Sequence, residues 1–536
     1  MCEVRGVRSW WRSGTAVAVG IAAATVVLHL ATGWRYGFDR DELMALEDAR
    51  HLAWGYVQYP PMTAFFGRVA LELFGTSLVG FRFFAAMAQA LALVLTGLMV
   101  RELGGGKWAQ VVAVLAGVPF CLGGGALMQY ISFDYVCWVW VAYGMIKVLG
   151  GEDRKSRERW WVAVGAGIGL GMMAKYTMLF LVAGLVVGVL MTGARRHLRS
   201  GWLWLGVAMA LGIFAPNFVW EWRRGFISLE FLRFLHVRDV GEKLTDWFLL
   251  GQAEVTLLAL PLAVAGIWFY FFAQEGKRWR GLGWMYAVPL LLFLVMRGRE
   301  YYLAPGYPML YAAGAVWVEE KIRTKEVRKQ RSDEVENGDA IGGAAERRGS
   351  EQPPLHKKGW RWVGTVIWVA LAVDIVVAGA VALPIAPVGT RWWNFAARVD
   401  SVFPEEIGWP EFVEAVALVR DRLPEEERAQ MGILAGNYGE VGALNLYGEK
   451  FGLPRAISGV NSSWERGYGD PPEVVIVVGY SRKFLEGEFA SCVVGGRVWN
   501  RYGVLNEETI EDPEVFVCRG LRGSWPEFWR RARRFA

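Results

Sequence analysis

The sequence predicts a polytopic α-helical membrane protein with about eleven transmembrane helices and a small α/β domain at its C-terminal end. Hydrophobic residues make up 54% of the 536 residues, charged residues 21%, and mean hydropathy is +0.25. These values are too apolar for a soluble chain of this length. The 28 Trp residues agree, because Trp is enriched at membrane interfaces. The net charge of +6 does not indicate nucleic-acid binding, because the basic residues lie mostly in short loops between apolar runs.

Apolar runs long enough to approach the thickness of a bilayer recur along the chain. The first, near Thr15–Ala31, follows Arg5, Arg8 and Arg12 and has no small-residue cleavage site after it, so we interpret it as a retained helix and not as a signal peptide. The other ten fall near Val79–Val100, Trp108–Leu127, Phe133–Leu149, Trp160–Ala174, Met178–Thr192, Trp202–Trp220, Phe248–Phe272, Leu282–Met296, Leu303–Val318 and Trp362–Leu383.

Loop charges predict the orientation. With the N-terminus in the cytoplasm, every predicted inside loop is basic, including RKSRER (154–159), ARRHLR (194–199) and GKRWR (276–280). The predicted outside loops are mixed or acidic, as in FDRDELMALEDAR (38–50). This alternation places the C-terminal tail outside the cell.

The chain divides by composition into four parts. Residues 1–320 form the predicted transmembrane core, 321–360 a charged and Gly-rich segment expected to be a disordered cytoplasmic linker, 361–383 the last span and 384–536 the outside domain. In the tail, a helix is expected over 411–423 and another over 443–452, with strands over 431–436, 473–480, 491–499 and 515–520. Cys492 and Cys518 lie in this tail, where pairing is left open, whereas Cys121 and Cys137 lie inside apolar runs.

Two adjacent carboxylates open the first outside loop. Asp41 and Glu42 directly precede MALEDARHLAW (44–54), which has the spacing of a helix lying on the membrane surface. Paired carboxylates at a membrane face suit acid/base or metal chemistry. The simpler alternative is a solvated helix start, because acidic residues favour the first turn.

Further charges are expected at the same face. Asp134, in QYISFDYVCW (129–138), lies at the outer end of a span, where a carboxylate is costly and usually functional; a helix cap is the alternative. Lys175 lies between two short spans and either snorkels to the interface or binds an anionic headgroup.

A third cluster follows in MRGREYYLAPGYPM (296–309). Arg297 and Arg299 beside Tyr301 and Tyr302 suit a lipid phosphate, although ordinary interfacial anchoring explains them equally well when they are taken alone. His236 is a lone histidine in another outside loop, and a structural role is the simpler interpretation for it. Acids and phosphate-binding cations from separate loops of one membrane face together suggest group transfer from a lipid phosphate.

At these residues the chain resembles a known family. The acid pair, ARHLAWGYVQYPPM (49–62), the acid before the fourth span, AKYTMLF (174–180) and REYYLAPGYPMLYAAGAV (299–316) occur in the order found in bacterial C-type membrane glycosyltransferases. These enzymes are related to the protein O-mannosyltransferases and to the lipid A aminoarabinose transferase. NYGEVGALNLYG (437–448) also resembles the periplasmic tail of one bacterial subgroup. One departure is Tyr59, because some relatives carry Lys immediately before the paired prolines.

The resemblance implies an inverting glycosyltransferase of the bacterial inner membrane, which moves a hexosyl or pentosyl unit from a polyprenyl-phosphate donor to a periplasmic glycan, lipid or protein. It implies Asp41 as the catalytic base, with Glu42 and Asp134 as further catalytic acids. Lys175 and Arg299 fall where cations that meet the donor phosphate are expected, and Arg297, Tyr301 and Tyr302 complete that predicted site. A divalent metal at Asp41, Glu42 or His236 is left open.

Two other classes compete with this hypothesis. A transporter or flippase for a lipid-linked glycan predicts charges near the bilayer midplane and internal repeats, whereas the charges here cluster at the outer interface and no repeat is evident. A membrane scaffold whose tail binds a partner would not require the acid pair.

Overall fold

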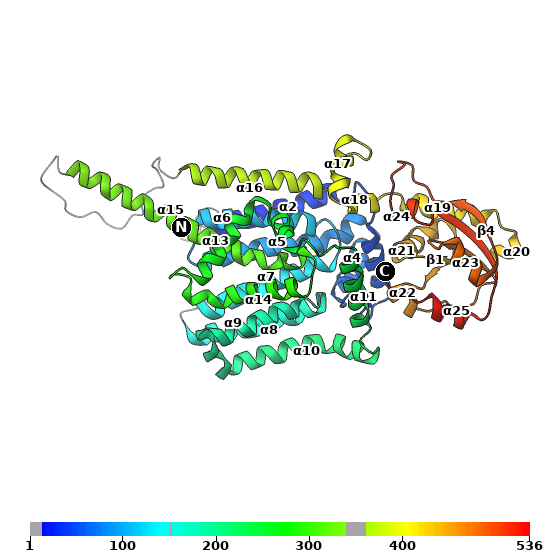
Figure 1. Ribbon diagram of the computed structural model, residues 1–536, viewed down its shortest axis with the longest axis horizontal. Helices are drawn as coiled ribbons and strands as arrows, with labels where there is room; N and C mark the ends of the chain where they lie inside the picture. The colour runs from blue at the N-terminus through cyan, green and yellow to red at the C-terminus, as the bar shows by residue number, and fades with distance from the viewer. Residues whose placement is uncertain (1–12, 151–152, 339–360) are drawn as a thin grey trace, which may run out of the picture.

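The computed structural model describes residues 13–150, 153–338 and 361–536. The predicted basic N-terminal segment with Arg5, Arg8 and Arg12 lies outside these residues. A bundle of long, roughly parallel helices forms one body, and a smaller domain with a β-sheet caps one end of it (Figure 1). The predicted fold class is therefore confirmed.

Each of the eleven apolar runs is helical. The corresponding elements are α2 (Gly14–Thr32), α5 (Leu78–Glu102), α6 (Lys107–Gly124), α7 (Tyr130–Gly150), α8 (Arg154–Ala174), α9 (Met178–Met191), α10 (Gly201–Arg223), α12 with α13 (Phe248–Thr256 and Leu260–Phe271), α14 (Arg280–Val295), α15 (Tyr307–Gly338) and α16 (Arg361–Ala382). By length and composition, seven helices of the described residues suffice to cross a membrane, or eight if α9 and the bent segment after it form one span. The number eleven therefore stays a prediction.

Small residues let the helices of the bundle approach closely. A Cβ at Gly165 of α8 would collide with the backbone carbonyl of Gly206 of α10. Inside a bilayer the hydrophobic effect does not drive helices together, because lipid tails are as apolar as the side chains. Close packing of the backbones at small residues stabilises their association instead.

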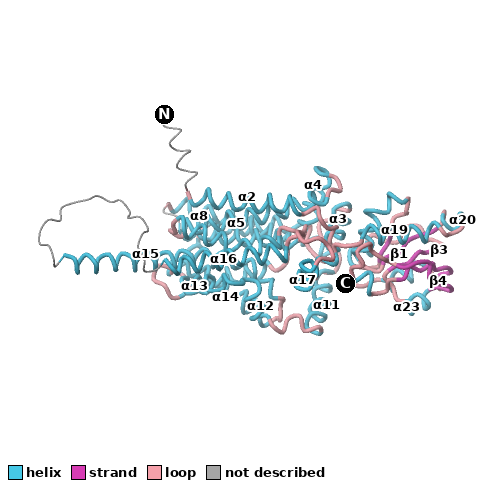
Figure 2. Tube along the Cα trace, turned by 90° about the horizontal axis from the view of Figure 1, so that it is seen from above, coloured by secondary structure: helices cyan, strands magenta, loops and turns pink. Residues whose placement is uncertain are grey.

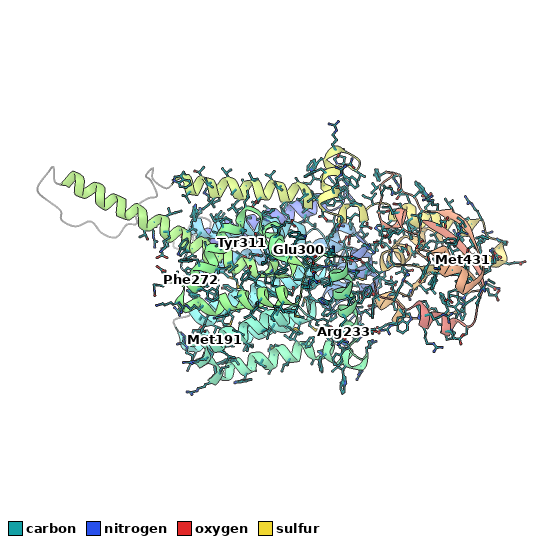
Figure 3. All side chains as sticks on the ribbon, viewed as in Figure 1. Met191, Arg233, Phe272, Glu300, Tyr311 and Met431 are labelled. Carbon is teal, nitrogen blue, oxygen red and sulfur yellow. A yellow bond between two sulfur atoms is a disulfide. The ribbon has the colours of Figure 1, made fainter. Side chains whose placement is uncertain are left out.

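The two ends of the bundle differ. Met191 and Phe272 lie at the end remote from the soluble domain, whereas Arg233 lies near that domain, which carries Met431 (Figure 3). The predicted inside and outside loops thus separate to opposite ends. Helix α15 projects from the remote end (Figure 2) and continues to Gly338, so the first part of the linker predicted over 321–360 is helical; residues 339–360 lie outside the described residues.

Shorter helices lie where the bundle meets the soluble domain and within that domain. They are α3 (Arg40–Arg50), α4 (Met62–Phe74), α11 (Ile227–Gly241), α17 (Arg391–Val399), α18 (Val402–Glu405), α19 (Trp409–Asp421), α20 (Glu425–Arg428), α21 (Tyr438–Tyr447), α22 (Asn461–Glu465), α23 (Arg482–Glu488), α24 (Glu507–Ile510) and α25 (Trp525–Ala532). Helices α19 and α21 confirm the two helices expected in the tail.

The soluble domain is built on one five-stranded sheet of order β2-β1-β3-β5-β4. The strands are β1 (Met431–Ala435), β2 (Ala456–Ser458), β3 (Val474–Val478), β4 (Phe489–Arg497) and β5 (Glu514–Leu521). Strands β2, β1 and β3 run parallel to one another, whereas β5 runs antiparallel to both of its neighbours, β3 and β4. Four strands match the expected ones, and β2 was missed because three residues carry no readable alternation. Cys492 and Cys518 face each other across β4 and β5 and form a disulfide.

Candidate active site

Helix α3 carries the acid pair and is clamped between the bundle and the soluble domain. Asp39 and Glu42 form a capping box at its start, which satisfies two backbone donors that a helix leaves free. Residues 42–49 are all buried. The helix expected over 44–54 begins earlier and ends at Arg50, and the soluble domain packs against it through α21. Its position at the membrane surface stays a prediction.

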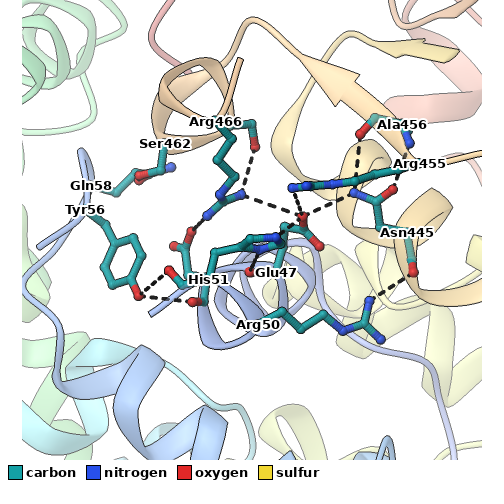
Figure 4. Close-up of polar contacts among 12 residues, drawn as sticks. Glu47, Arg50, His51, Tyr56, Gln58, Asn445, Arg455, Ala456, Ser462 and Arg466 are labelled. Carbon is teal, nitrogen blue, oxygen red and sulfur yellow. Dashed lines mark hydrogen bonds and ion pairs between the residues drawn. The ribbon is translucent and has the colours of Figure 1, made fainter. Parts of the chain in front are cut away.

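Polar contacts hold α3 against the soluble domain (Figure 4). Arg50 donates to the carbonyl of Asn445 at 2.9 Å, and Arg466 forms an ion pair with the buried carboxylate of Asp48. The hydroxyl of Tyr59 donates to the same carboxylate at 2.6 Å. Tyr59, the position where some relatives have Lys, therefore anchors α3.

Glu42 is buried completely and paired. Arg82 of α5 donates to both of its carboxylate oxygens, at 2.6–3.1 Å, and Met128 donates its backbone N–H to Glu42 at 2.8 Å. Arg82 also reaches Glu406 at 3.3 Å, and burial raises the pKa of Glu406 to about 7. The second acid of the pair thus joins a buried ion triad that links α3, α5 and the tail. The catalytic role that the resemblance implied for Glu42 stays a prediction.

Asp41 is half-buried and faces the neighbouring loops. Burial raises the pKa of its carboxyl, while Arg40 and a hydrogen bond with Tyr438 of α21 oppose the shift. Arg40 lies 5.0 Å from the ring of Tyr438 and forms an ion pair with Glu507, so the soluble domain supplies part of the surroundings of Asp41. A carboxyl with a raised pKa is suited to accept a proton near neutral pH.

Lys175 sits in an aromatic cage directly after α8. Its ammonium lies 4.1 Å from the ring centre of Tyr302, 5.0 Å from that of Tyr130 and 5.3 Å from that of Tyr301. The side chain makes no hydrogen bond or ion pair with any residue that the structure describes. Asp134 attracts this charge and Arg299 repels it. Ring faces therefore hold the ammonium in direct contact, Asp134 acts on it only electrostatically, and an anion could still pair with it.

Asp134 is the fifth residue of α7, at the start of its second turn, with 3% of its surface exposed. One carboxylate oxygen accepts from the hydroxyl of Thr177 at 3.1 Å, and the other is buried without a hydrogen bond among the described residues. Thr177 follows Lys175 by two residues, so Asp134 supports the turn that presents the ammonium.

The two arginines predicted to bind the donor phosphate together, Arg297 and Arg299, have different partners in the structure. Arg299 forms a two-pronged ion pair with Asp239 of α11, both distances being 2.7 Å, and it acts electrostatically on Asp41, Tyr130 and Lys175. Burial opposes the effect, yet these hydrogen bonds hold the pKa of Asp239 below its usual range. Arg297 has a positive φ of 50° and instead pairs with Asp246, with 48% of its side chain exposed.

The residues considered for a metal do not fit one. Glu42 is occupied by Arg82, and His236 is exposed on α11. Over residues 13–150, 153–338 and 361–536, no group of three His, Cys, Asp or Glu side chains is arranged to hold a metal ion. We derive no step through a metal.

The structure thus brings together Asp41, Asp134, Lys175, Arg299, Tyr301 and Tyr302, and leaves Arg297 and His236 apart from them. Sequence reasoning missed Tyr130, Asp239 and Tyr438, which complete the cluster. Tyr438 lies in the NYGEVG segment that carried the resemblance in the tail, so that motif was a usable signal. Asp239 carried no such signal.

The helical bundle and the soluble domain at its end share their fold with solved structures. The chain aligns with ArnT from Cupriavidus metallidurans bound to undecaprenyl phosphate, with a TM-score of 0.57 and 15% identity over 94% of this chain and 97% of that one. The apo state of the same protein gives 0.54 and 16%, covering 96% of this chain and 98% of that one.

Sequence comparisons agree with this fold. Residues 58–220 match the dolichyl-phosphate-mannose-protein mannosyltransferase family. A lipid A galacturonosyltransferase, RgtD of Rhizobium johnstonii, is 24% identical over 327 residues, which cover 57% of this chain. The alignment spans 65% of that relative, a little under two thirds of its length. The predicted resemblance is confirmed as a similarity: residues 58–220 match the mannosyltransferase family model, and the whole chain shares the fold of ArnT.

Proposed function

We propose that this protein is an inverting glycosyltransferase that takes a sugar from a polyprenyl-phosphate donor. The observation that carries the proposal is the ammonium of Lys175, which ring faces hold near Arg299 and which forms no ion pair with Asp134 or with any other residue that the structure describes. A partly buried cation without a paired anion is unfavourable unless an anion joins it. A lipid phosphate at the membrane interface satisfies that requirement.

The chemistry follows from the placement of the groups. The acceptor hydroxyl or amine attacks the anomeric carbon, and Asp41 takes its proton. The bond between that carbon and the phosphate oxygen breaks, and its electron pair leaves with the polyprenyl phosphate. Lys175 and Arg299 stabilise the negative charge that develops there. A single displacement inverts the anomeric configuration, because no covalent enzyme intermediate forms.

The names of the relatives support a lipid-borne acceptor. RgtD is named for transfer to lipid A, which supports a lipid acceptor, whereas the undecaprenyl phosphate bound to ArnT supports the proposed donor. We propose accordingly that the acceptor is a periplasmic envelope glycan or lipid, and that a hexosyl or pentosyl unit is transferred to it.

The direct test is an assay in liposomes. Purified protein is given a panel of polyprenyl-phosphate sugars, and release of free polyprenyl phosphate is followed with and without a cell-envelope extract. Extract-dependent release supports the proposal. Movement of the lipid-linked sugar between leaflets without release from any donor would contradict it and favour a flippase.

Lys175→Met should weaken binding of polyprenyl phosphate by about tenfold to a hundredfold, because a charge-assisted hydrogen bond contributes about 1.5–3 kcal/mol. Met keeps the length and packing of the side chain while it removes the charge. The measurement is a binding titration with undecaprenyl phosphate in detergent, with the exposed Lys483→Met as control. Equal affinity in both variants would make Lys175 a snorkelling residue only.

Tyr438→Phe should move the acid limb of the pH–rate profile to higher pH. Burial raises the pKa of Asp41, and the hydrogen bond from Tyr438 lowers it. When this hydrogen bond is removed, the pKa of Asp41 should therefore rise further. The base acts when deprotonated, and activity therefore falls as pH drops through the raised pKa. The exposed Tyr502→Phe is the control. An unchanged profile in Tyr438→Phe would separate Tyr438 from the base.

We propose that the soluble domain, 384–536, faces the periplasm and that the N-terminus is cytoplasmic. Support comes from the alternating loop charges and from the disulfide between Cys492 and Cys518, because disulfides persist in oxidising compartments. Alkaline phosphatase fused at the C-terminus should then be active, and a cytoplasmic reporter at the same place inactive. The reverse result would overturn this orientation.

A further inference from the structure

A separate cavity of about 540 Å³ lies between α3 and the soluble domain. Its walls come from the amino end of β1, from β2, from the loop 466–473 that precedes β3 and from Glu47 of α3. This volume falls within the range of about 300–1,000 Å³ typical of ligand pockets, which often lie at domain interfaces. None of the residues proposed above for the reaction lines it.

Hydrogen-bonding groups without partners face this cavity. Asn445, Arg455 and Arg466 all contact Oε1 of Glu47, at 3.2, 3.2 and 3.9 Å. Oε2 of Glu47 accepts no hydrogen bond within the described parts of the chain. Gln430, an exposed lining residue, has a side-chain amide that likewise makes no hydrogen bond with the described residues. Acceptors and donors therefore stand side by side.

One wall of the cavity is aromatic. The ring of Tyr468 stacks on Trp525 at 5.5 Å and meets Trp529 edge to face at 5.6 Å, which fixes its position. The phenol hydroxyl forms no hydrogen bond with the described residues. A rigid aromatic body with a polar tip suits a ligand that presents both apolar and hydroxyl surface.

The charge of the lining decides between ligand classes. Arg455 and Arg466 are the cations, whereas Glu47, Asp470 and Glu473 are the anions. Both guanidinium groups already contact Glu47, and the carboxylates exceed them in number, so phosphate or another anion is disfavoured. A neutral sugar both donates and accepts hydrogen bonds, and therefore matches the mixture of carboxylate, amide, guanidinium and phenol.

We propose that this cavity binds a neutral sugar unit of the acceptor glycan. Glu47 lies on the same helix as Asp41, about 9 Å further along its axis, so α3 connects the cavity to the proposed base. The assignment of the sugar to an acceptor rests on the proposed glycosyltransferase function; the binding site itself does not.

The test measures binding without any donor. The full-length protein in detergent is titrated with methyl glycosides of glucose, galactose, mannose and N-acetylglucosamine. Gln430→Ala and Arg455→Gln alter exposed or half-exposed lining residues, and Lys483→Met serves as the control outside the cavity. We expect at least one glycoside to bind to the wild type. Both lining variants should bind it at least tenfold more weakly, and the control variant should bind it as tightly as the wild type.

Three results would overturn the proposal: no glycoside binding to folded wild type, binding that the lining variants leave unchanged, or displacement of the glycoside by inorganic phosphate. Asp41→Asn separates this proposal from the catalytic one, because that variant should still bind glycoside. If Asp41→Asn retains full transfer while the lining variants lose sugar binding, the assigned base fails and the cavity stands. In the liposome assay, the lining variants should raise KM for acceptor at unchanged kcat.

Discussion

Asp41→Asn should reduce sugar transfer by about 10²–10⁴-fold, the usual contribution of a positioned general base. The amide keeps the shape of the carboxylate and can still meet Tyr438, but it cannot accept the proton of the acceptor. Affinity for undecaprenyl phosphate should change little, because Lys175 and Arg299 are intact. Release of polyprenyl phosphate in liposomes and a separate donor titration provide the two measurements.

The matched control is Asp421→Asn, an exposed residue of α19. Transfer at the rate of wild type in Asp41→Asn would remove Asp41 from the role of base. Loss of donor affinity together with transfer would instead assign Asp41 to the donor site. The wild-type acid limb should also lie above the ordinary carboxylate range, since burial raises the pKa of Asp41.

Glu42→Gln should destabilise the protein by about 3–5 kcal/mol, the usual cost of breaking a buried ion pair from one side. Arg82 would keep its charge in a site where only 3% of its surface is exposed, with Glu406 as its remaining carboxylate partner. The measurement is thermal unfolding in detergent, with the exposed Glu425→Gln as control.

The double variant Glu42→Gln/Arg82→Met completes the cycle. It should recover part of the lost stability, because Arg82 no longer leaves an unpaired buried charge. Glu406 loses its cation as well, but burial raises its pKa to about 7, so it can become neutral at modest cost. A stable Glu42→Gln protein that has lost transfer would restore the catalytic role implied by the resemblance. A destabilised protein with residual transfer would make Glu42 the residue that positions Asp41 through α3.

Local hydropathy was sufficient to locate the bundle. Each apolar run became a helix, because a bilayer-length run of apolar residues satisfies its own backbone only as a helix in lipid. Four of the five strands were equally readable, since each contains Val, Ile or other apolar residues next to turn residues. The three-residue strand β2 was not readable, because its pairing with β1 and not its own pattern makes it a strand.

The site shows a different limit. Asp41 and Glu42 are adjacent and chemically alike, yet one faces Tyr438 while the other is held by Arg82, forty residues further along the chain. Arg297 and Arg299 are likewise two residues apart and pair with Asp246 and Asp239 in turn. Sequence spacing could not distinguish the members of either pair, because their partners come from other helices.

The sequence by itself determined the class of protein, the apolar helices, the alternation of the loops and the set of charges at one face of the bundle. Only the tertiary structure decided which of those charges are already paired and which stay open to a ligand. The physical reason is that burial in lipid depends on the composition of a local run. The state of a charged side chain depends instead on the groups that folding brings within a few ångströms of it, as Arg82 is brought to Glu42 and Tyr438 to Asp41.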